Sequence, residues 1–226
     1  MNPATRPSNP RLPRHYPTAA AKCADLTVHV VGLTLALVGG VVLLVLAVQA
    51  GSISKTVGVA IYAAGLVAML AFSTAYNFAS PVHRPLLRRL DHAGIFLMIA
   101  GSYTPFTTAN LTGAWAWGMT GAIWGLAAAG ALGKLFLRHV GRGFSVGVYL
   151  LMSWLVVIAF QPMLASTTGW ALGLLALGGV LYSTGIIFYL NKQLKFARAI
   201  WHGHVVAAAG AHWAAVLVGV VLTPTQ

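Results

Sequence analysis

The sequence contains almost no acidic residues: Asp25 and Asp91 are its two carboxylates, and glutamate is absent from all 226 residues. Charged residues of both signs make up 7% of the chain and hydrophobic residues 58%. A soluble domain carries about 25% charged residues, which this chain lacks. The composition therefore excludes an ordinary soluble protein and predicts a multi-pass membrane protein.

Cysteine is also nearly absent, because Cys23 is the single one in the chain. An intramolecular disulfide is therefore excluded. The formal net charge of +12 is typical of nucleic-acid binding in a soluble protein. Here the basic residues lie in short stretches between apolar runs, where they orient a membrane protein. We therefore expect membrane lipids, and no nucleic acid, as partners.

Long hydrophobic runs are what the sequence does contain. A helix needs about 20 apolar residues to cross the hydrocarbon core of a bilayer, and open strands are not viable there. The runs cover residues 26–49, 57–79, 91–109, 114–135, 144–164, 168–190 and 200–222. They predict an all-α fold, a bundle of seven transmembrane helices in one domain over residues 24–226. Residues 1–23 are rich in arginine and proline, and we expect a disordered basic tail.

The positions of the basic residues predict the orientation of this bundle. All 14 of them except Lys55 fall on one side of the predicted membrane. That side holds Arg6, Arg11, Arg14, Lys22, Arg84, Arg88, Arg89, Lys134, Arg138, Arg142, Lys192, Lys195 and Arg198. Because basic loops stay in the cytoplasm, the N-terminus is predicted to be cytoplasmic and the C-terminus outside. The expected location is the plasma (inner) membrane.

This topology brings several polar residues together at the cytoplasmic leaflet. Ser73 and Asn77 lie near the end of the second run, Asp91 begins the third, and Arg198 and His202 begin the seventh. A carboxylate inside a membrane segment is costly unless it is paired, so such residues are functional candidates. We interpret Ser73 and Asp91 as the candidate catalytic residues and His202 as a candidate metal ligand.

Three further histidines, His29, His92 and His212, complete the list of candidate polar residues. His202 shares a helical face with Arg198, four residues earlier, whereas His212 lies about 15 Å deeper and is turned away from that face. Each residue alone also has a structural interpretation. An intramembrane histidine can bridge helices, an arginine can snorkel to the headgroups, and a serine can bond its own helix. Their joint position favours a functional site.

Six stretches resemble the hemolysin III family, which belongs with the progestin and adipoQ receptors. They are Ala24-Asp25 to His29-Val-Val-Gly32; Ser73-Thr-Ala-Tyr76-Asn77 with Leu87-Arg-Arg-Leu-Asp91-His92-Ala-Gly-Ile95; Ile99-Ala-Gly-Ser-Tyr-Thr-Pro-Phe106; and Gly185-Ile-Ile-Phe-Tyr189 with Ala199-Ile-Trp-His202 through His212. The resemblance implies seven helices with a cytoplasmic N-terminus. It also implies a zinc site near the cytoplasmic face.

The zinc ligands that the resemblance implies are only partly present. Ser73, Asp91 and His202 match the family pattern, but Asn77 and Arg198 stand where two ligand histidines are expected. A catalytic zinc ion takes about three protein ligands, and arginine, which stays protonated, does not coordinate. We therefore expect a degenerate site without a cofactor, with zinc as the alternative. Our hypothesis is that the Arg198 guanidinium replaces the metal and pairs with Asp91, with Asn77 bonded in the same cluster.

Several functions remain open at this point. The first is a receptor-like or membrane-homeostasis protein with a lipid ligand. The second, implied by the family zinc site, is a zinc-dependent hydrolase of a lipid amide. A pore-forming cytolysin, as the family name implies, and a proton-coupled transporter using Asp91, His202 and His212 are further alternatives. The sequence leaves the substrate and the oligomeric state open.

Overall fold

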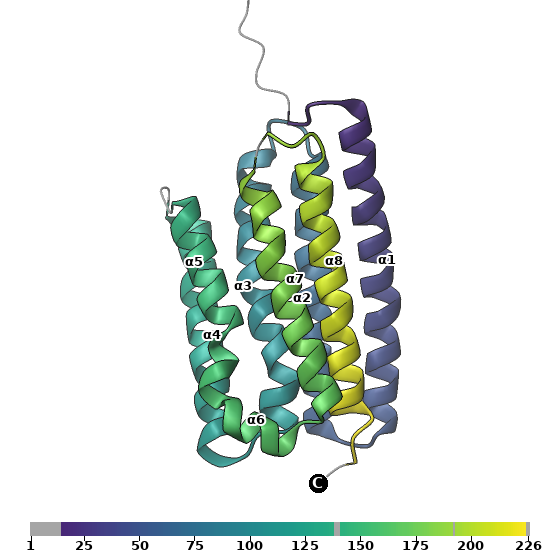
Figure 1. Ribbon diagram of the computed structural model, residues 1–226, viewed down its shortest axis with the longest axis vertical. Coiled ribbons are helices and arrows are strands. Elements are labelled where there is room, and N and C mark those ends of the chain that lie inside the picture. The colour runs from purple at the N-terminus through teal and green to yellow at the C-terminus, as the bar shows by residue number, and fades with distance from the viewer. Residues whose placement is uncertain (1–14, 138–140, 192, 225–226) are drawn as a thin grey trace, which may run out of the picture.

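The computed structural model describes residues 15–137, 141–191 and 193–224, and every helix or strand assigned there is a helix. This confirms the predicted all-α class. The elements are α1 (Ala19–Gln49), α2 (Ile53–Phe78), α3 (Arg84–Ala109), α4 (Gly113–Phe136), α5 (Arg142–Ser153), the 3₁₀ helix η1 (Leu155–Ala159), α6 (Phe160–Ser166), α7 (Gly169–Leu190), α8 (Ala197–Val216) and the π-helix η2 (Leu217–Val221). The long helices run side by side along one axis (Figure 1).

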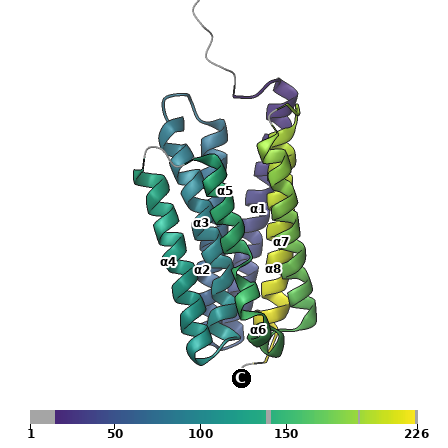
Figure 2. The same ribbon diagram turned by 60° about the vertical axis from the view of Figure 1, so that its left-hand side comes forward.

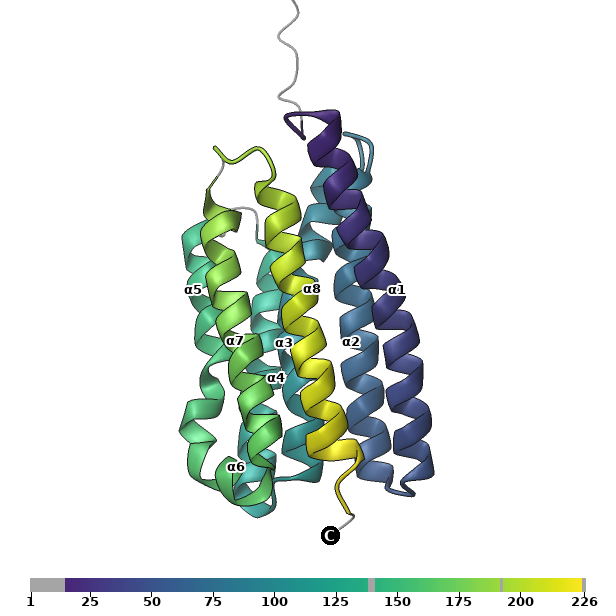
Figure 3. The same ribbon diagram turned by 45° about the vertical axis from the view of Figure 1, so that its right-hand side comes forward.

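Helix α2 packs against both α1 and α3, and α8 packs against α7 and α1. Helix α4 packs on the far side of α3, so it lies at the edge of the bundle (Figure 2). Helices α1, α3 and α8 begin at the same end of the bundle, and α2 ends there (Figure 3). The C-terminus lies at the opposite end. This arrangement collects the polar ends of four helices in one place.

Helix α1 shows how the sequence positions the site. Its buried residues recur every three or four positions, which is the spacing of one helical face. They are Ala21, Asp25, His29, Gly32, Ala36, Gly40, Leu43 and Ala47. The other faces carry exposed valines and leucines, such as Val38 and Val41, which suits contact with lipid. Asp25 and His29 therefore point into the bundle because they share the face that packs.

The fifth hydrophobic run forms three short helical pieces, α5, η1 and α6, where one continuous helix was predicted. The Tyr103 hydroxyl enters this break. It lies 2.9 Å from the Met152 carbonyl and 3.0 Å from the Ser153 carbonyl, and it accepts from the Val156 amide at 2.9 Å. A side chain inserted into the backbone ladder is a recognised cause of a break in a helix. The Tyr103 hydroxyl of α3 thus forms hydrogen bonds with backbone groups that the break in the helix leaves without an intrahelical partner.

Six helices are long and apolar enough to cross a membrane: α1, α2, α4, residues 143–166, α7, and residues 197–221. Helix α3 has a comparable length of 26 residues, but it starts with charged residues: Arg84, Arg88, Arg89 and Asp91. Six of the seven predicted runs therefore qualify by composition, within the described residues. Most of the helices also begin earlier than the predicted apolar runs: α3 starts seven residues before Asp91, with proline in its first turn.

The N-terminal boundary of the membrane domain differs from the prediction. Helix α1 begins at Ala19, where the Thr18 hydroxyl accepts from the Ala21 amide at 3.1 Å and caps the first turn. Residues 19–23, which were assigned to the disordered tail, are therefore helical. Residues 1–14 of that tail lie outside the described residues, as do Arg138 and Lys192 of the charge count.

Candidate functional site

Polar side chains from four helices meet at the end of the bundle where α1, α3 and α8 begin. Asp25 and His29 come from α1, Ser73 and Asn77 from α2, Asp91 from α3, and Arg198 and His202 from α8. The first four are buried. The predicted convergence of Ser73, Asn77, Asp91, Arg198 and His202 is thus present, and α1 adds two members to it. We call the set of Asp25, His29, Ser73, Asn77, Asp91, Arg198 and His202 the polar cluster.

Asp25 is the centre of the hydrogen bonds in the polar cluster. Its side chain is fully buried, and its Oδ1 lies 2.6 Å from Nδ1 of His202. The Tyr16 hydroxyl donates to the other carboxylate oxygen, Oδ2, at 2.5 Å. Because a buried carboxylate is costly without donors, these two contacts explain how α1 tolerates Asp25 near the start of a membrane helix.

His29 has a defined tautomer in this arrangement. Its Nδ1 lies 2.8 Å from the backbone carbonyl of Asp25, and a carbonyl oxygen only accepts. The proton is therefore on Nδ1, and Nε2 carries a free lone pair. That Nε2 lies 3.4 Å from the Ser73 hydroxyl, and the His29 ring meets the His202 ring edge-on at 4.3 Å between centroids. Such a nitrogen can bind a metal ion or accept a proton.

Arg198 makes contacts that differ from the predicted ones. Its guanidinium donates to Asn77 Oδ1 at 3.0 Å and to His15 Nε2 at 2.7 Å. Asn77 in turn donates through Nδ2 to the Ser73 carbonyl at 3.0 Å. Asn77 is therefore a member of the cluster, as expected, and it acts as the acceptor for the guanidinium.

The predicted ion pair between Arg198 and Asp91 is not formed. Within the described part of the chain, the carboxylates lie within 4.0 Å of a basic side chain only where Asp25 contacts His202 and His29. The physical reason is the position of Asn77, whose amide oxygen lies between helices α2 and α8 and takes the guanidinium instead. Asp91 lies near the Ser73 side chain, and the positively charged groups around it are those of His202, Arg88 and Arg198. It belongs to the same end of the bundle without a direct guanidinium partner.

Two residues before α1 cover the polar cluster. Burial, together with the nearby charges of Arg198 and Arg84, lowers the pKa of His15 from its ordinary 6.5 to about 4. Burial and the Asp25 carboxylate raise the pKa of the Tyr16 hydroxyl. At neutral pH both side chains are uncharged, with His15 accepting from Arg198 and Tyr16 donating to Asp25. The segment is thus tied to α8 and α1.

A metal ion would find one suitable donor set in the described residues. The ligand atoms of Asp25, His29 and His202 all lie within 4.8 Å of one another. Two imidazole nitrogens and a carboxylate oxygen are ligands that zinc accepts. Asn77 and Arg198, the positions where the sequence resemblance implied two ligand histidines, do not suit a metal ion, because the protonated guanidinium donates to the asparagine oxygen.

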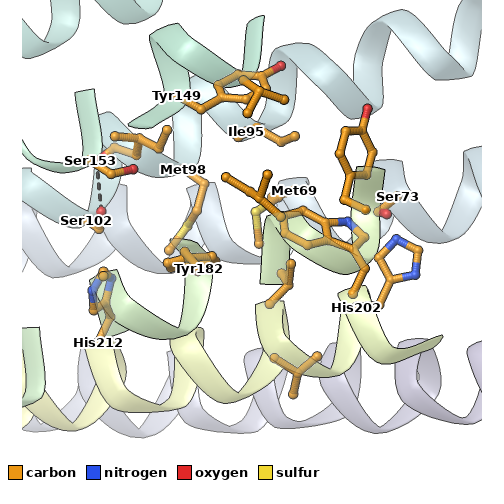
Figure 4. A pocket seen from close by; sticks show the side chains of 18 of the residues that line it. Met69, Ser73, Ile95, Met98, Ser102, Tyr149, Ser153, Tyr182, His202 and His212 are labelled. Carbon is orange, nitrogen blue, oxygen red and sulfur yellow. Dashed lines mark hydrogen bonds between the residues drawn. The ribbon is translucent and has the colours of Figure 1, made fainter. Parts of the chain in front are cut away.

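The polar cluster forms one end of a cavity of about 740 Å³ that runs between the helices. Figure 4 shows Ser73 and His202 at one end and His212 at the other, with Met69 and Met98 between them. The lining is mostly apolar away from the cluster and includes Phe106, Met119 and Met163. The cavity therefore combines a charged end with a long hydrophobic interior.

The remaining predicted histidines, His92 and His212, are outside the donor set of Asp25, His29 and His202. His212 Nε2 lies 3.4 Å from the Leu175 carbonyl, while its Nδ1 and the hydroxyl of the neighbouring Tyr182 are buried without a hydrogen-bond partner among the described residues. The two rings are 5.6 Å apart. His92 lines the cavity on α3, and its carbonyl accepts from Tyr149 at 3.0 Å. His29 alone of the three joins the donor set of His202.

Sequence reasoning missed the role of Asp25. The signal was present, because Asp25 is one of two acids and precedes His29 by four residues, which places both on one helical face. What the sequence does not contain is the contact between α1 and α8 that brings Asp25 to His202. Tyr16 and His15, assigned to a disordered tail, were missed for the same reason.

The comparisons with known proteins agree with this architecture. The chain matches the family described as "Haemolysin-III related" over residues 23–213. It is 34% identical to "Hemolysin-3" of Bacillus cereus over 183 residues, or 79% of this chain and 82% of that protein. It is 34% identical to the "Hemolysin-3 homolog" of Bacillus subtilis (strain 168) over 208 residues, or 92% and 98%.

A human protein is also similar. The chain is 30% identical over 174 residues to the "Monocyte to macrophage differentiation factor" of Homo sapiens, covering 74% of this chain and 71% of that protein. The family match extends over α1 to α8, including every member of the polar cluster. The chain belongs to the haemolysin-III related family and is a multi-pass membrane protein.

Proposed function

We propose that this chain is a seven-span protein of the plasma membrane that binds a lipid in its central cavity, with the lipid headgroup at the polar cluster. Its role is then that of a receptor or a regulator of membrane lipids. The cavity carries this proposal, because it joins a charged end to an apolar interior in one space of about 740 Å³. Ligand sites of about 300–1,000 Å³ accommodate drug-sized molecules.

The proposed orientation places the polar cluster at the cytoplasmic leaflet. Lys22, Arg88 and Lys195 lie at or beyond the helix ends on the cluster side, whereas Lys55 lies near the other end, where its ammonium donates to the Thr223 carbonyl. Cytoplasmic loops carry the excess of basic residues. Seven spans follow if α3 crosses together with the six more apolar segments, and this places the two termini on opposite sides.

The family ligand positions contain no metal in this proposal. Arg198 contributes a fixed positive charge, and Asn77 holds the guanidinium in place at 3.0 Å. An arginine presents several donors in one plane, which suits the phosphate or carbonyl oxygens of a lipid headgroup. Arg198 therefore anchors the headgroup, and the methionine-rich interior takes the hydrocarbon chain.

Lipid analysis of the purified protein tests the proposal. Extraction and mass spectrometry should find a lipid that stays bound through detergent exchange. Met98→Trp fills the cavity beside Met69 and should lower the amount of lipid per chain (Figure 4). Leu126→Trp, on the exposed face of α4, is the matched control and should retain it. Equal lipid content in the two variants contradicts the proposal.

A lipid-amide hydrolase is the second candidate, because the unprotonated His29 Nε2 lies beside the Ser73 hydroxyl at 3.4 Å. That nitrogen is a general base within the cluster, positioned by the Asp25 carbonyl through its other ring nitrogen. Release of fatty acid from a long-chain amide in detergent micelles, lost in His29→Gln, supports this candidate. Release that is unchanged in His29→Gln and in Ser73→Ala contradicts it.

A further inference from the structure

The substitutions at the family ligand positions coincide with a second group of donors around His202. Asn77 and Arg198 cannot bind a metal ion together, yet Asp25 and His29 approach His202 from α1. We propose that the chain binds a zinc ion through Asp25, His29 and His202, a ligand set displaced toward α1. This site is independent of whether the cavity holds a lipid.

The donor chemistry supports this ligand set. Two histidines and one carboxylate form a common three-ligand arrangement for zinc, with a further position open. The ligand atoms lie within 4.8 Å of one another, and those of a tetrahedral zinc ion lie about 3.3 Å apart, given metal–ligand distances near 2.0–2.2 Å. Side-chain rotation within the cluster would bring the donors to this spacing: Asp25 Oδ1 and His202 Nδ1, 2.6 Å apart, would separate slightly, and the longer distances would shorten.

Neighbouring groups orient the donors in the way that metal sites require. A metal-binding histidine donates its other ring N–H to a carbonyl or carboxylate. His29 does this with the Asp25 carbonyl at 2.8 Å, which leaves Nε2 free to coordinate. The Tyr16 hydroxyl occupies Oδ2 of Asp25 at 2.5 Å and leaves Oδ1 facing the histidines.

The distribution of charge also favours a cation at this position. Both carboxylates of the chain, Asp25 and Asp91, come from helices that begin at this end, and Asp25 Oδ1 lies 2.6 Å from His202 Nδ1. The guanidinium of Arg198 is directed to Asn77 and His15, away from the Asp25 carboxylate. A buried carboxylate beside two imidazoles offers the donor types that zinc takes, and a bound ion would supply a Lewis acid at the polar end of the cavity.

Metal content measures this proposal directly. The full chain, purified with an affinity tag that contains no histidine, is incubated with Zn²⁺ or Co²⁺ and desalted. Elemental analysis should find about one ion per chain, and Co²⁺ should give the visible absorption of a tetrahedral site. His29→Gln and His202→Gln should each lower affinity by more than about tenfold, since loss of an outer-shell partner alone costs that much.

His204→Gln is the matched control. His204 lies on the same helix and bonds the Ile200 carbonyl through Nδ1 at 2.8 Å, but it is outside the donor set. It should keep the parent's metal content. Because a variant can fail to fold, the parent's thermal unfolding is also measured with and without added Zn²⁺. A rise in Tm that is present in His204→Gln and absent in His29→Gln supports the site.

Three results overturn the proposal. The first is a parent that binds no metal, which would make the Asp25–His202 contact a structural pair. The second is a His29→Gln variant that binds as much as the parent. The third is metal bound only after Asn77→His with Arg198→His, which would return the site to the family positions. Bound lipid is measured in the same samples, so failure here is distinct from failure of the lipid proposal.

Discussion

Asp25 shows how one residue determines the polar cluster. Its carboxylate is fully buried, and its partners are the His202 ring at 2.6 Å and the Tyr16 hydroxyl at 2.5 Å. Removing one member of a buried pair leaves the other uncompensated, whereas removing both costs much less. The contribution of Asp25 to the free energy of unfolding is therefore measured best by changing Asp25 and His202 singly and together.

We expect Asp25→Asn to destabilise the protein by about 3–5 kcal/mol in the metal-free state. The double variant Asp25→Asn with His202→Gln should unfold at a higher temperature than the sum of the two single changes implies. Thermal unfolding in detergent with a chelator present measures this coupling. Strictly additive losses would show that the two side chains do not form a pair.

His15 gives the cluster a dependence on pH. Its folded pKa of about 4 is below the ordinary value of 6.5, so protonation favours the state in which His15 is released. The stabilising contact is complete above about pH 6.5 and is lost as the pH falls toward 4. The guanidinium of Arg198 and the nearby Arg84 oppose protonation from the other helices.

The release of His15 can be measured by limited proteolysis of the N-terminal segment at pH values between 7 and 4. Cleavage before α1 should increase as the pH falls through this interval, because a protonated His15 cannot accept from Arg198. His15→Gln keeps an acceptor without titrating and should cleave at a nearly constant rate. If cleavage of His15→Gln depends on pH as strongly as cleavage of the parent, then a group other than His15 causes the pH dependence.

At the scale of the elements, the hydrophobic runs predicted the helices well, and the packing between helices was not predictable from them. Hydropathy placed all seven runs on helices, since lipid forces backbone groups to bond within a segment. The break between α5 and α6 depends on Tyr103, which is 50 residues away in sequence from Ser153. The Asp25–His202 contact likewise joins the first and last long helices. Such contacts arise from tertiary packing, which periodicity does not encode.

The glycines illustrate the same limit. The spacings Gly121–Gly125, Gly143–Gly147 and Gly169–Gly173 are typical of close helix packing. In the structure, a Cβ added at any of these six positions meets nothing within 4 Å. At Gly58 on α2, however, the added atom lies 2.9 Å from the Pro105 Cα of α3. A close contact between these two helices therefore depends on Gly58, which is outside the three spacings above.

Gly58→Ala should therefore destabilise the bundle by about 1–3 kcal/mol, because the opposing atom is backbone and cannot rotate away. Gly121→Ala is the control, since its Cβ points into open space. Thermal unfolding of the two variants in the same detergent compares them. A Gly58→Ala variant as stable as Gly121→Ala would mean that α2 and α3 separate at little cost.

At the scale of the whole molecule, the charge distribution and the cavity support the same orientation in the membrane. Among the described residues, the basic side chains other than Lys55, both acids and the polar end of the cavity lie at one end of the bundle, and Lys55 lies near the other. An orientation with this end in the cytoplasm satisfies the positive-inside rule and makes the polar cluster reachable from the inner leaflet. The orientation depends on α3 crossing the membrane despite its charged first turns.

Reporter fusions in a bacterial host test this topology. Alkaline phosphatase fused after residue 81, between α2 and α3, should be inactive, because that loop is predicted to be cytoplasmic. Fused after residue 111, between α3 and α4, or at the C-terminus, it should be active. A fluorescent protein that matures only in the cytoplasm should give the opposite pattern. If the fusion after residue 111 fluoresces, α3 does not cross, and the polar cluster then lies beside a re-entrant segment instead of a seventh span. Asp91 would then lie in a segment that does not span the membrane. Its position could no longer be interpreted as that of a carboxylate at the start of a membrane-spanning helix.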